Sequence, residues 1–513
     1  MRVGGGIRIA RRQGEAAYDV PPNGQADATM AVNHEHLGHL LRRAGFGASA
    51  SELSALDGKS TFEALAYVMD VDDQPDDVDS KIGQPDYINV TARGPFSPNS
   101  NVEDARQRWL FRMVHSRRPL QEKMTLFWHN HFATAYSKIA GTFGAVQGTK
   151  MMANKAGELP GPQGQIETFR EKGLGSFRDL LVDMARDPGM LVWLDGRTNT
   201  RQRPQENFGR EIMELFTLGV GNYTEEDVYA AARVFTGWNL RLVGNALDTS
   251  GYYEFVYIPN NHDPTAKTFT FPIYPDGSKT IPARAAGGGM QDGIDFITAL
   301  ATHPATAERL ARKLWNFFVS EEIPPDPDYL RGATGIYFAN GTRIKPLVQY
   351  TLQSRWFQNP ANWHGRYAWP VEFAVRAVKE VGFLGFSVDN MRAPLIAMGQ
   401  TLFEPPDVNG WELGQGWFST GAMLARMNFA SIIAANQRFN LASAAAGAKD
   451  SPDTFADYFL ERLSPAPFEQ EPLDSLKAYL VDGAAWTGST AQLQTKAAGL
   501  ARLIVGSAEY QLM

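Results

Sequence analysis

The 513-residue chain contains no cysteine. Disulfides, thiolate nucleophiles, iron–sulfur clusters and zinc sites built on cysteine are therefore excluded. Long apolar runs are also missing: no stretch approaches the roughly 18 residues that a membrane-spanning helix requires. The N-terminus is basic at Arg2, Arg8, Arg11 and Arg12, but it lacks the apolar core of about 7–15 residues of a secretory signal. This favours a cytoplasmic setting, with a periplasmic or secreted one as the alternative.

Basic clusters are equally scarce. The net charge is −7, and the basic residues form only short pairs such as Arg42-Arg43, which argues against nucleic-acid binding. The glycine run Gly287–Gly289 lacks the Lys-Ser/Thr of a phosphate-binding loop and the strand context of a dinucleotide fingerprint. No Gly-x-Ser-x-Gly elbow occurs, which weakens an α/β-hydrolase interpretation.

What the chain does contain is a large apolar fraction, 43%, with 30 Phe, 17 Tyr and 11 Trp. Helical periodicity dominates, so we predict a mainly α fold: a large multi-helix domain with a small β-hairpin insertion around residues 250–275. The expected strands are 252–258, which is aromatic, and a short one around 267–273. Residues 1–30 are predicted to be a loose arm, 31–440 the main helical domain, and 441–513 a helical segment packed on it.

Several helix starts carry recognisable signals. Ser49 and Glu52 have the spacing of a capping box. Pro119 fits the first turn of a helix that continues to Phe132. Thr224 is placed to cap a helix whose first turn is acidic.

The stretch 206–219 has an unusual pattern. It is predicted to be a helix closed by Gly219 and Gly221, with Asn207, Arg210, Glu211 and Glu214 on one face and apolar residues around most of the rest. A helix of this kind is usually buried, so the charged residues must be paired, bound to a ligand or directed at a cleft. Glu211 and Glu214 fit an acid–base or metal-binding pair; Arg210 and Glu214, at i and i+4, fit a structural ion pair.

Two histidine-bearing segments are further candidates. In an extended segment, His129 and His131 would face one way and could hold Zn²⁺, Mn²⁺ or Fe. In a helix, which the preceding residues favour, they diverge by about 200° and cannot chelate together, leaving one of them as an acid or base. His262-Asp263 has the composition of a site loop, although an ordinary turn before Pro264 fits equally.

Three tryptophans follow glycines: Trp238, Trp411 and Trp417. Each is a candidate surface for stacking a sugar ring, with core packing as the alternative. Asn207, on the charged face of 206–219, is a further candidate for contact with substrate.

Several segments together resemble a large bacterial family catalogued as domain of unknown function 1800. The matching segments are residues 39–47, 123–132, 206–221 with 223–225, 235–238, 262–263 with 267–268, 313–315, and 405–411. They extend over roughly 34–435, and residues 507–511 resemble the family's end. One departure is Trp369, where the family commonly has lysine. The resemblance supplies no activity. Because members often accompany a family resembling sulfatases and alkaline phosphatases, it implies an envelope or secreted setting and a sulfatase-like partner.

From these residues we hypothesise a hydrolase acting on a glycan or related polar polymer. Its cleft would be lined by Arg210, Glu211, Glu214, His129, His262 and Asp263. Without metal, one glutamate with a raised pKa gives a proton and a second carboxylate acts as base or nucleophile. With a divalent metal, His129 or His131, His262, Glu211 and Glu214 supply the ligands. The alternative is a non-catalytic helical scaffold or envelope-associated binding protein, in which the charged residues form a structural network.

Overall fold

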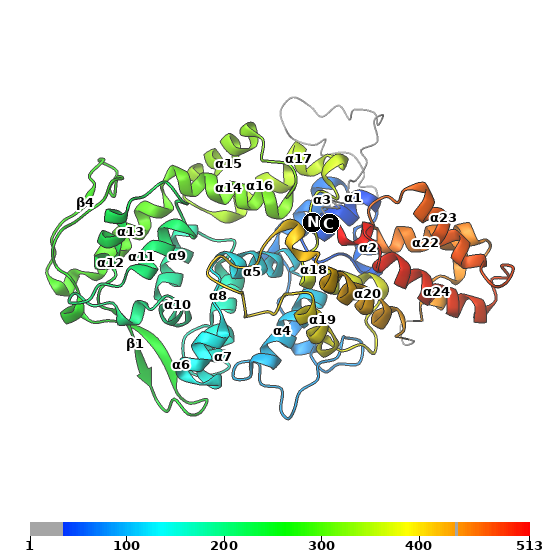
Figure 1. Ribbon diagram of the computed structural model, residues 1–513, viewed down its shortest axis with the longest axis horizontal. Helices are drawn as coiled ribbons and strands as arrows, with labels where there is room; N and C mark the ends of the chain where they lie inside the picture. The colour runs from blue at the N-terminus through cyan, green and yellow to red at the C-terminus, as the bar shows by residue number, and fades with distance from the viewer. Residues whose placement is uncertain (1–33, 437–439) are drawn as a thin grey trace, which may run out of the picture.

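A computed structural model describes residues 34–436 and 440–513 and confirms the mainly α fold (Figure 1). The predicted arm, residues 1–30, lies outside the described residues. The helices before the strands are α1 (His34–Arg43), α2 (Ala50–Leu56), α3 (Thr61–Met69), α4 (Val102–His115), α5 (Pro119–His131), α6 (Tyr136–Phe143), α7 (Ala145–Ala153), α8 (Gln165–Lys172), α9 (Phe177–Arg186), α10 (Pro188–Trp193), α11 (Glu206–Glu214) and α12 (Glu225–Val234).

The helices after the strands complete the fold. They are α13 (Met290–Ala301), α14 (Pro304–Phe318), α15 (Pro327–Ala339), α16 (Ile344–Gln353), α17 (Arg355–Gln358), α18 (Pro370–Val381), α19 (Arg392–Ala397), α20 (Thr420–Ala434), α21 (Leu441–Ala444), α22 (Pro452–Leu463), α23 (Gln470–Val481) and α24 (Thr490–Val505). None of the helices within the described ranges has the length and apolarity needed to cross a membrane.

Two small antiparallel sheets interrupt the helices. Strand β2 (Tyr252–Tyr257) lies where an aromatic strand was predicted, and its partner is the preceding β1 (Trp238–Val243), in the register Trp238↔Tyr257. The connecting loop favours this pairing, because the Asp248 carboxylate accepts hydrogen bonds from Asn245 and Ser250 and closes it. The segment after residue 267 contributes only β3 (Lys267–Thr268), which pairs with β4 (Thr280–Ile281).

The predicted helix starts are present. Ser49 accepts from the Glu52 N–H and Glu52 accepts from the Ser49 N–H, so both halves of the capping box form. Thr224 and Asp227 do the same for α12. Pro119 is in the first turn of α5, where its missing N–H costs no intrahelical hydrogen bond.

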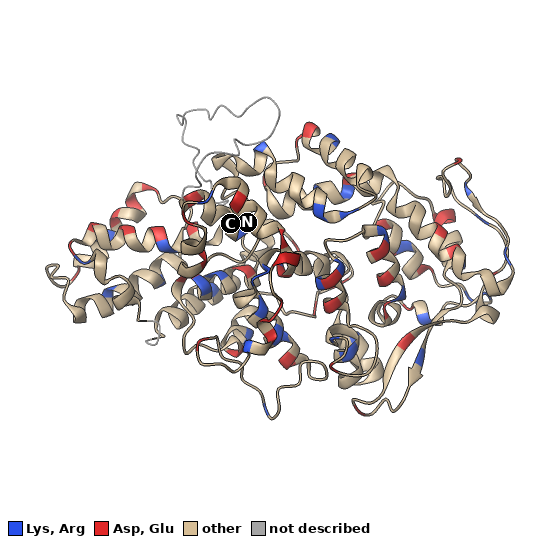
Figure 2. Cartoon of the chain, turned by 180° about the vertical axis from the view of Figure 1, so that it is seen from behind, with Lys and Arg blue, Asp and Glu red and all other residues tan. Residues whose placement is uncertain are grey.

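The molecule is elongated, as Figure 1 shows. The β1–β2 hairpin and α11–α13 lie at one end and α22–α24 at the other, with α5 and α18 near the centre. The Arg376 guanidinium of α18 joins the C-terminal segment to this centre, since it donates to the carbonyls of Leu463, Ser464, Tyr510 and Leu512 at 2.7–3.2 Å. Acidic and basic residues are interspersed over the chain (Figure 2).

A buried carboxylate connects the central elements. Glu372 of α18 accepts two hydrogen bonds from Arg366, at 2.9 and 2.8 Å, and also pairs with Lys123 of α5. All three side chains are fully buried. Burial alone would raise the pKa of Glu372, but Arg366 and Lys123 lower it to about 2. Glu372 therefore supplies the anion for two buried cations, at a site where a lone charge would be strongly destabilising.

We expect Glu372→Gln to lower the free energy of unfolding by about 3–5 kcal/mol, because it leaves two buried cations without their anion. Urea denaturation measures this loss. In the wild type, the same contribution is present above a pH of about 4.5, the ordinary pKa of glutamate, and is lost as the pH falls toward 2.

Glu225→Gln is the matched control. Glu225 also pairs with an arginine, Arg210, but its side chain is 74% exposed, so its loss is expected to change the free energy of unfolding far less than the loss of Glu372. Equal losses in the two variants would contradict a structural role for the buried carboxylate.

Candidate functional site

A cavity of about 230 Å³ lies where the C-terminal end of α5 meets α14. Its wall combines aromatic rings, amides and charged groups. The lining residues are Phe127, Asn130, His131, Leu215, Arg309, Lys313, Asn316, Phe317, Glu321, Trp369, Val408, Asn409, Trp411 and Leu413. Concave sites with apolar walls and a few convergent polar groups are the usual form of ligand sites. This cavity is therefore the candidate site.

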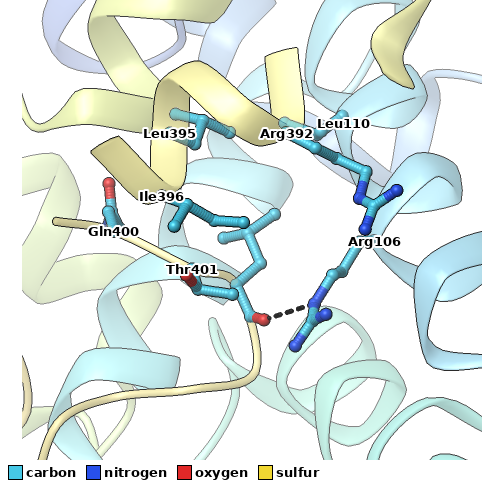
Figure 3. A pocket seen from close by; sticks show the side chains of 8 residues that line it. Arg106, Leu110, Arg392, Leu395, Ile396, Gln400 and Thr401 are labelled. Carbon is cyan, nitrogen blue, oxygen red and sulfur yellow. Dashed lines mark hydrogen bonds between the residues drawn. The ribbon is translucent and has the colours of Figure 1, made fainter. Parts of the chain in front are cut away.

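A second hollow, shown in Figure 3, lies between α4 and α19. Its volume is about 20 Å³, enough for roughly one water molecule. Its Arg106 donates from Nε to the Leu402 carbonyl at 2.9 Å, and both Arg106 and Arg392 pair with Glu103. Its cations are thus already satisfied by the protein.

The end of α5 shapes the candidate site through three consecutive residues. His129 accepts a hydrogen bond at Nε2 from the Phe403 N–H (3.1 Å), and Asn130 accepts at Oδ1 from the Trp411 N–H (2.7 Å). His131 instead contacts Phe216 and the α14 lysine described below. On a helix, neighbouring residues point in different directions. His129 and Asn130 therefore reach two points of one segment, and His131 reaches α14.

Residues 403–413, here called the strap, are fixed by the first two of these contacts. The strap contributes Val408, Asn409, Trp411 and Leu413 to the cavity wall. Gly410 permits its close approach to α5: its φ is +85°, and a Cβ there would lie 2.2 Å from Asn130 Oδ1. A glycine is required here both for the left-handed backbone and for the space.

The most unusual charge in the cavity is the amine of Lys313. It donates to His131 Nδ1 at 2.9 Å, and it has no carboxylate within ion-pair distance among the described residues. Burial, followed by the neighbouring Arg309, lowers the pKa of Lys313 to about 7. Burial and the cations of Lys313 and Arg309 hold the pKa of His131 well below its usual value, so its ring is neutral.

Arg309 lies one turn before Lys313 on α14. Its Nε and Nη2 donate to the Leu215 carbonyl at 3.3 and 3.2 Å, which attaches the end of α11 to the cavity wall. Its Nη1 donates to no described residue. The cavity thus contains a guanidinium with a free donor beside a lysine without a counter-ion.

One acid faces these cations. Glu321 accepts from the Tyr367 N–H at 3.2 Å and lies 3.8 Å from Arg366 Nε. Burial raises the pKa of Glu321, and Arg366 only partly opposes this. Arg366 also lies over the rings of Phe317 and Trp369, at 4.8 and 5.2 Å from their centroids. The guanidinium that holds Glu372 therefore also supports this wall of the site.

The charged face of α11 does not line this cavity. The helix ends at Glu214, earlier than Gly219, and its face is at the surface: Asn207 is exposed, and Arg210, Glu211 and Glu214 are half-buried. The prediction of a helix buried all round was wrong, because Phe208, Ile212 and Met213 cover only the side that packs inward.

The pairing within this face also differs from the predicted ion pair. Arg210 forms a bidentate pair with Glu225 of α12 (2.8 and 2.7 Å), and Glu214 accepts from the Tyr223 hydroxyl. Burial, then Glu214, raises the pKa of Glu211. Arg210 therefore pairs with Glu225 of the neighbouring helix and not with Glu214 of its own helix.

His262 and Asp263 belong to a structural network rather than to a site loop. His262 is fully buried, with Nδ1 2.9 Å from the Thr236 carbonyl and Nε2 3.2 Å from Asp292. Asp263 pairs with Arg233 at 2.7 Å. Burial would raise the pKa of Asp263, but hydrogen bonds from Arg233 and Thr265 lower it below its usual value. These contacts fix the β insertion to α12 and α13.

Among the described residues, no group of three or more His, Asp or Glu side chains is arranged to hold a metal ion. His129 faces the strap, His131 faces α14, and His262 is bound to Asp292 in the β insertion. The histidines proposed as ligands are thus engaged in three different sets of contacts.

The three tryptophans have different surroundings. Trp411 lines the cavity, with its ring 5.2 Å from that of His129. Trp238 is in the core, between Phe235 and Phe255. Trp417 is buried with its ring 6.3 Å from that of Trp369, which does line the cavity. One of the three predicted stacking surfaces is therefore at the candidate site.

Sequence reasoning missed the polar residues of α14: Arg309, Lys313 and Asn316. A signal was present, because they recur at i, i+4 and i+7 on one helical face. Arg309 and Lys313 form a like-charged i, i+4 pair, which is unfavourable on an ordinary helix surface. Lys313 also has no acid three or four residues away in the sequence. These two features indicate that the charge of Lys313 does not stabilise α14 and has another role.

We expect Gly410→Ala to detach the strap from α5, because the added Cβ collides with Asn130. Hydrogen exchange measured by mass spectrometry should show faster exchange in peptides covering 403–413. Gly414→Ala is the control, since Gly414 is also left-handed (φ +67°) but has open space around it. Identical exchange in the two variants would show that the close approach to Asn130 does not hold the strap.

Neither a curated protein nor a solved structure matches the chain significantly. A family model does match, over residues 39–512, and it covers the cavity and every element around it. The chain therefore belongs to the family described as protein of unknown function (DUF1800).

Proposed function

We propose that the cavity between α5, α14 and the strap binds a single anionic, ring-sized group, with an acidic sugar of a polar polymer as the leading class. The observation that carries this proposal is the cation pair of Arg309 and Lys313, which has no carboxylate partner within ion-pair distance among the described residues. A charge of this kind in a partly buried wall is stabilised when a ligand supplies the anion.

The shape and the walls support a small ring rather than a long chain. The volume of about 230 Å³ is below the roughly 300–1,000 Å³ of sites for drug-sized ligands. Trp411 and Trp369 offer flat apolar surfaces, and Asn130, Asn316 and Asn409 line the same space with amides. Aromatic faces with amide groups suit the apolar and hydroxyl-bearing faces of a sugar.

Arg309→Gln tests the proposal by removing the free guanidinium donor. A charge-assisted hydrogen bond contributes about 1.5–3 kcal/mol, so the affinity for glucuronate should fall about tenfold or more. Isothermal titration calorimetry of the full chain measures it, with glucose as the uncharged comparison ligand.

Arg312→Gln is the control from the same helix. Arg312 faces solvent, 49% exposed, and pairs with Glu308, so this variant should bind like the wild type. Equal binding of glucuronate and glucose, or equal losses in both arginine variants, would contradict an anion site. No binding of any acidic sugar would favour the scaffold alternative.

Hydrolysis is the second candidate function, and Glu321 is the observation that favours it. A carboxyl with a raised pKa in an enclosed wall can donate a proton to a leaving group. Glu321, rather than Glu211, lines the cavity. In this version Glu321→Gln should abolish release of acidic sugar from a polymer, measured by reducing-end assay, while glucuronate binding persists. Release by the variant at the wild-type rate would exclude Glu321 as the acid.

A further inference from the structure

We propose that Lys313 is a nucleophilic amine that forms an imine with an aldehyde or ketone carrying an anionic group. This inference rests on the proposed function, because the anionic group would be held by Arg309 in the same cavity. It adds a covalent step to the proposed function, and it specifies a ligand that carries a carbonyl as well as an anionic group.

Lys313 is half-buried, and its partners differ from those of two fully buried lysines of the core. Lys123 pairs with Glu372, and Lys267 pairs with Asp292 at 2.5 Å. Each of these two amines is therefore paired with a carboxylate, although burial also lowers the pKa of Lys123 to about 7. Among the described residues, the Lys313 amine has one hydrogen-bond partner, the neutral His131 imidazole, and the charge that acts on it is that of another cation, Arg309. A lysine desolvated beside another cation is the arrangement that favours a free amine.

The hydrogen bonding of His131 fixes the direction of the amine. The carbonyl of Phe216 can only accept, so His131 Nε2, at 3.1 Å, carries the proton. His131 Nδ1 is then the acceptor for an N–H of Lys313. Because the imidazole has no proton to offer at Nδ1, the lone pair of the neutral amine is not consumed by this contact. It stays available to an electrophile in the cavity that Lys313 lines.

The protonation state agrees with this geometry. Burial and Arg309 lower the pKa of Lys313 to about 7, whereas an ordinary lysine titrates near 10.4. The other charged or titratable groups around it are His131 on α5, Glu321 after α14, and Glu214 on α11, which acts on Arg309. About half of the Lys313 side chains are then neutral at pH 7, a fraction about a thousand times larger than for an exposed lysine.

The step balances without an oxidant or reductant. The Lys313 nitrogen attacks the carbonyl carbon, and the carbonyl π electrons move to oxygen. One amine proton is transferred to that oxygen to give a carbinolamine. The nitrogen then loses its second proton, the hydroxyl is protonated and leaves as water, and the imine remains.

The ligand class follows from the neighbouring groups. Arg309 stays protonated at physiological pH and directs a carboxylate or phosphate next to the amine. The smallest probe that combines the two groups is glyoxylate, an aldehyde joined to a carboxylate. Propionaldehyde is the comparison probe without the anion.

The experiment traps the imine in the full-length protein. Wild-type protein is incubated with glyoxylate and sodium cyanoborohydride, and the modified lysines are located by peptide mass spectrometry. We expect labelling of Lys313 at least tenfold faster than that of the exposed Lys449, rising with pH to a plateau just above 7. Propionaldehyde should lose this preference, and Arg309→Gln should slow the glyoxylate reaction about tenfold while Arg312→Gln leaves it unchanged.

The outcomes separate this inference from the anion site. Failure to label Lys313, with Arg309-dependent binding of glucuronate intact, overturns the covalent step alone. Equal labelling of Lys313 and Lys449, or a rate that keeps rising to pH 10, also overturns it. Loss of both labelling and glucuronate binding overturns the proposed function as well. The mapping and the pH profile use wild-type protein, so the test does not depend on the folding of a Lys313 variant.

Discussion

The buried carboxylate of Glu372 is the interaction on which the rest of the structure depends. It draws Lys123 of α5 and Arg366 together at the start of α18. Arg366 in turn lies against Phe317 and Trp369 and near Glu321, three residues of the cavity wall. The site therefore forms where segments distant in sequence are held together by one carboxylate shared between two buried cations.

The cations of the cavity differ from those of this cluster in their partners. In the core Lys123 and Lys267 each pair with a carboxylate, whereas no carboxylate of the described residues lies within ion-pair distance of Lys313 or Arg309 in the cavity. Because an isolated charge is costly away from water, an anionic ligand in the cavity would stabilise these cations. Anion binding and an activated amine would both follow from the lack of a carboxylate partner for Lys313 and Arg309. The strap, which is fixed by His129 and Asn130, borders the cavity in which both would occur.

The sequence was most informative where local rules decide the outcome. The capping residues Ser49 and Thr224, the proline that starts α5, and the aromatic strand β2 were predicted because each depends on nearby residues. The family resemblance was confirmed over nearly the whole chain. The pairing of Arg210 with Glu225 was not predictable, because the distance between α11 and α12 is a property of the tertiary structure.

The residues of the candidate site were predictable only in part, again because their contacts depend on the tertiary structure. Trp411 and His131 were selected from sequence and do line the cavity, but Arg309 and Lys313 lie some 180 residues further along than His131 and were missed. The acidic face of α11 was predicted to be a site because charged residues on an apolar background can be recognised in a sequence. An unpaired cation is visible only once its neighbours in space are known.

A crystal structure of the protein with glucuronate at saturating concentration tests the central claim most directly. The account predicts the sugar carboxylate within hydrogen-bonding distance of Arg309 Nη1, next to the Lys313 amine, with the ring against Trp411 or Trp369. A cavity that contains only water, or a sugar bound elsewhere on the molecule, would contradict it.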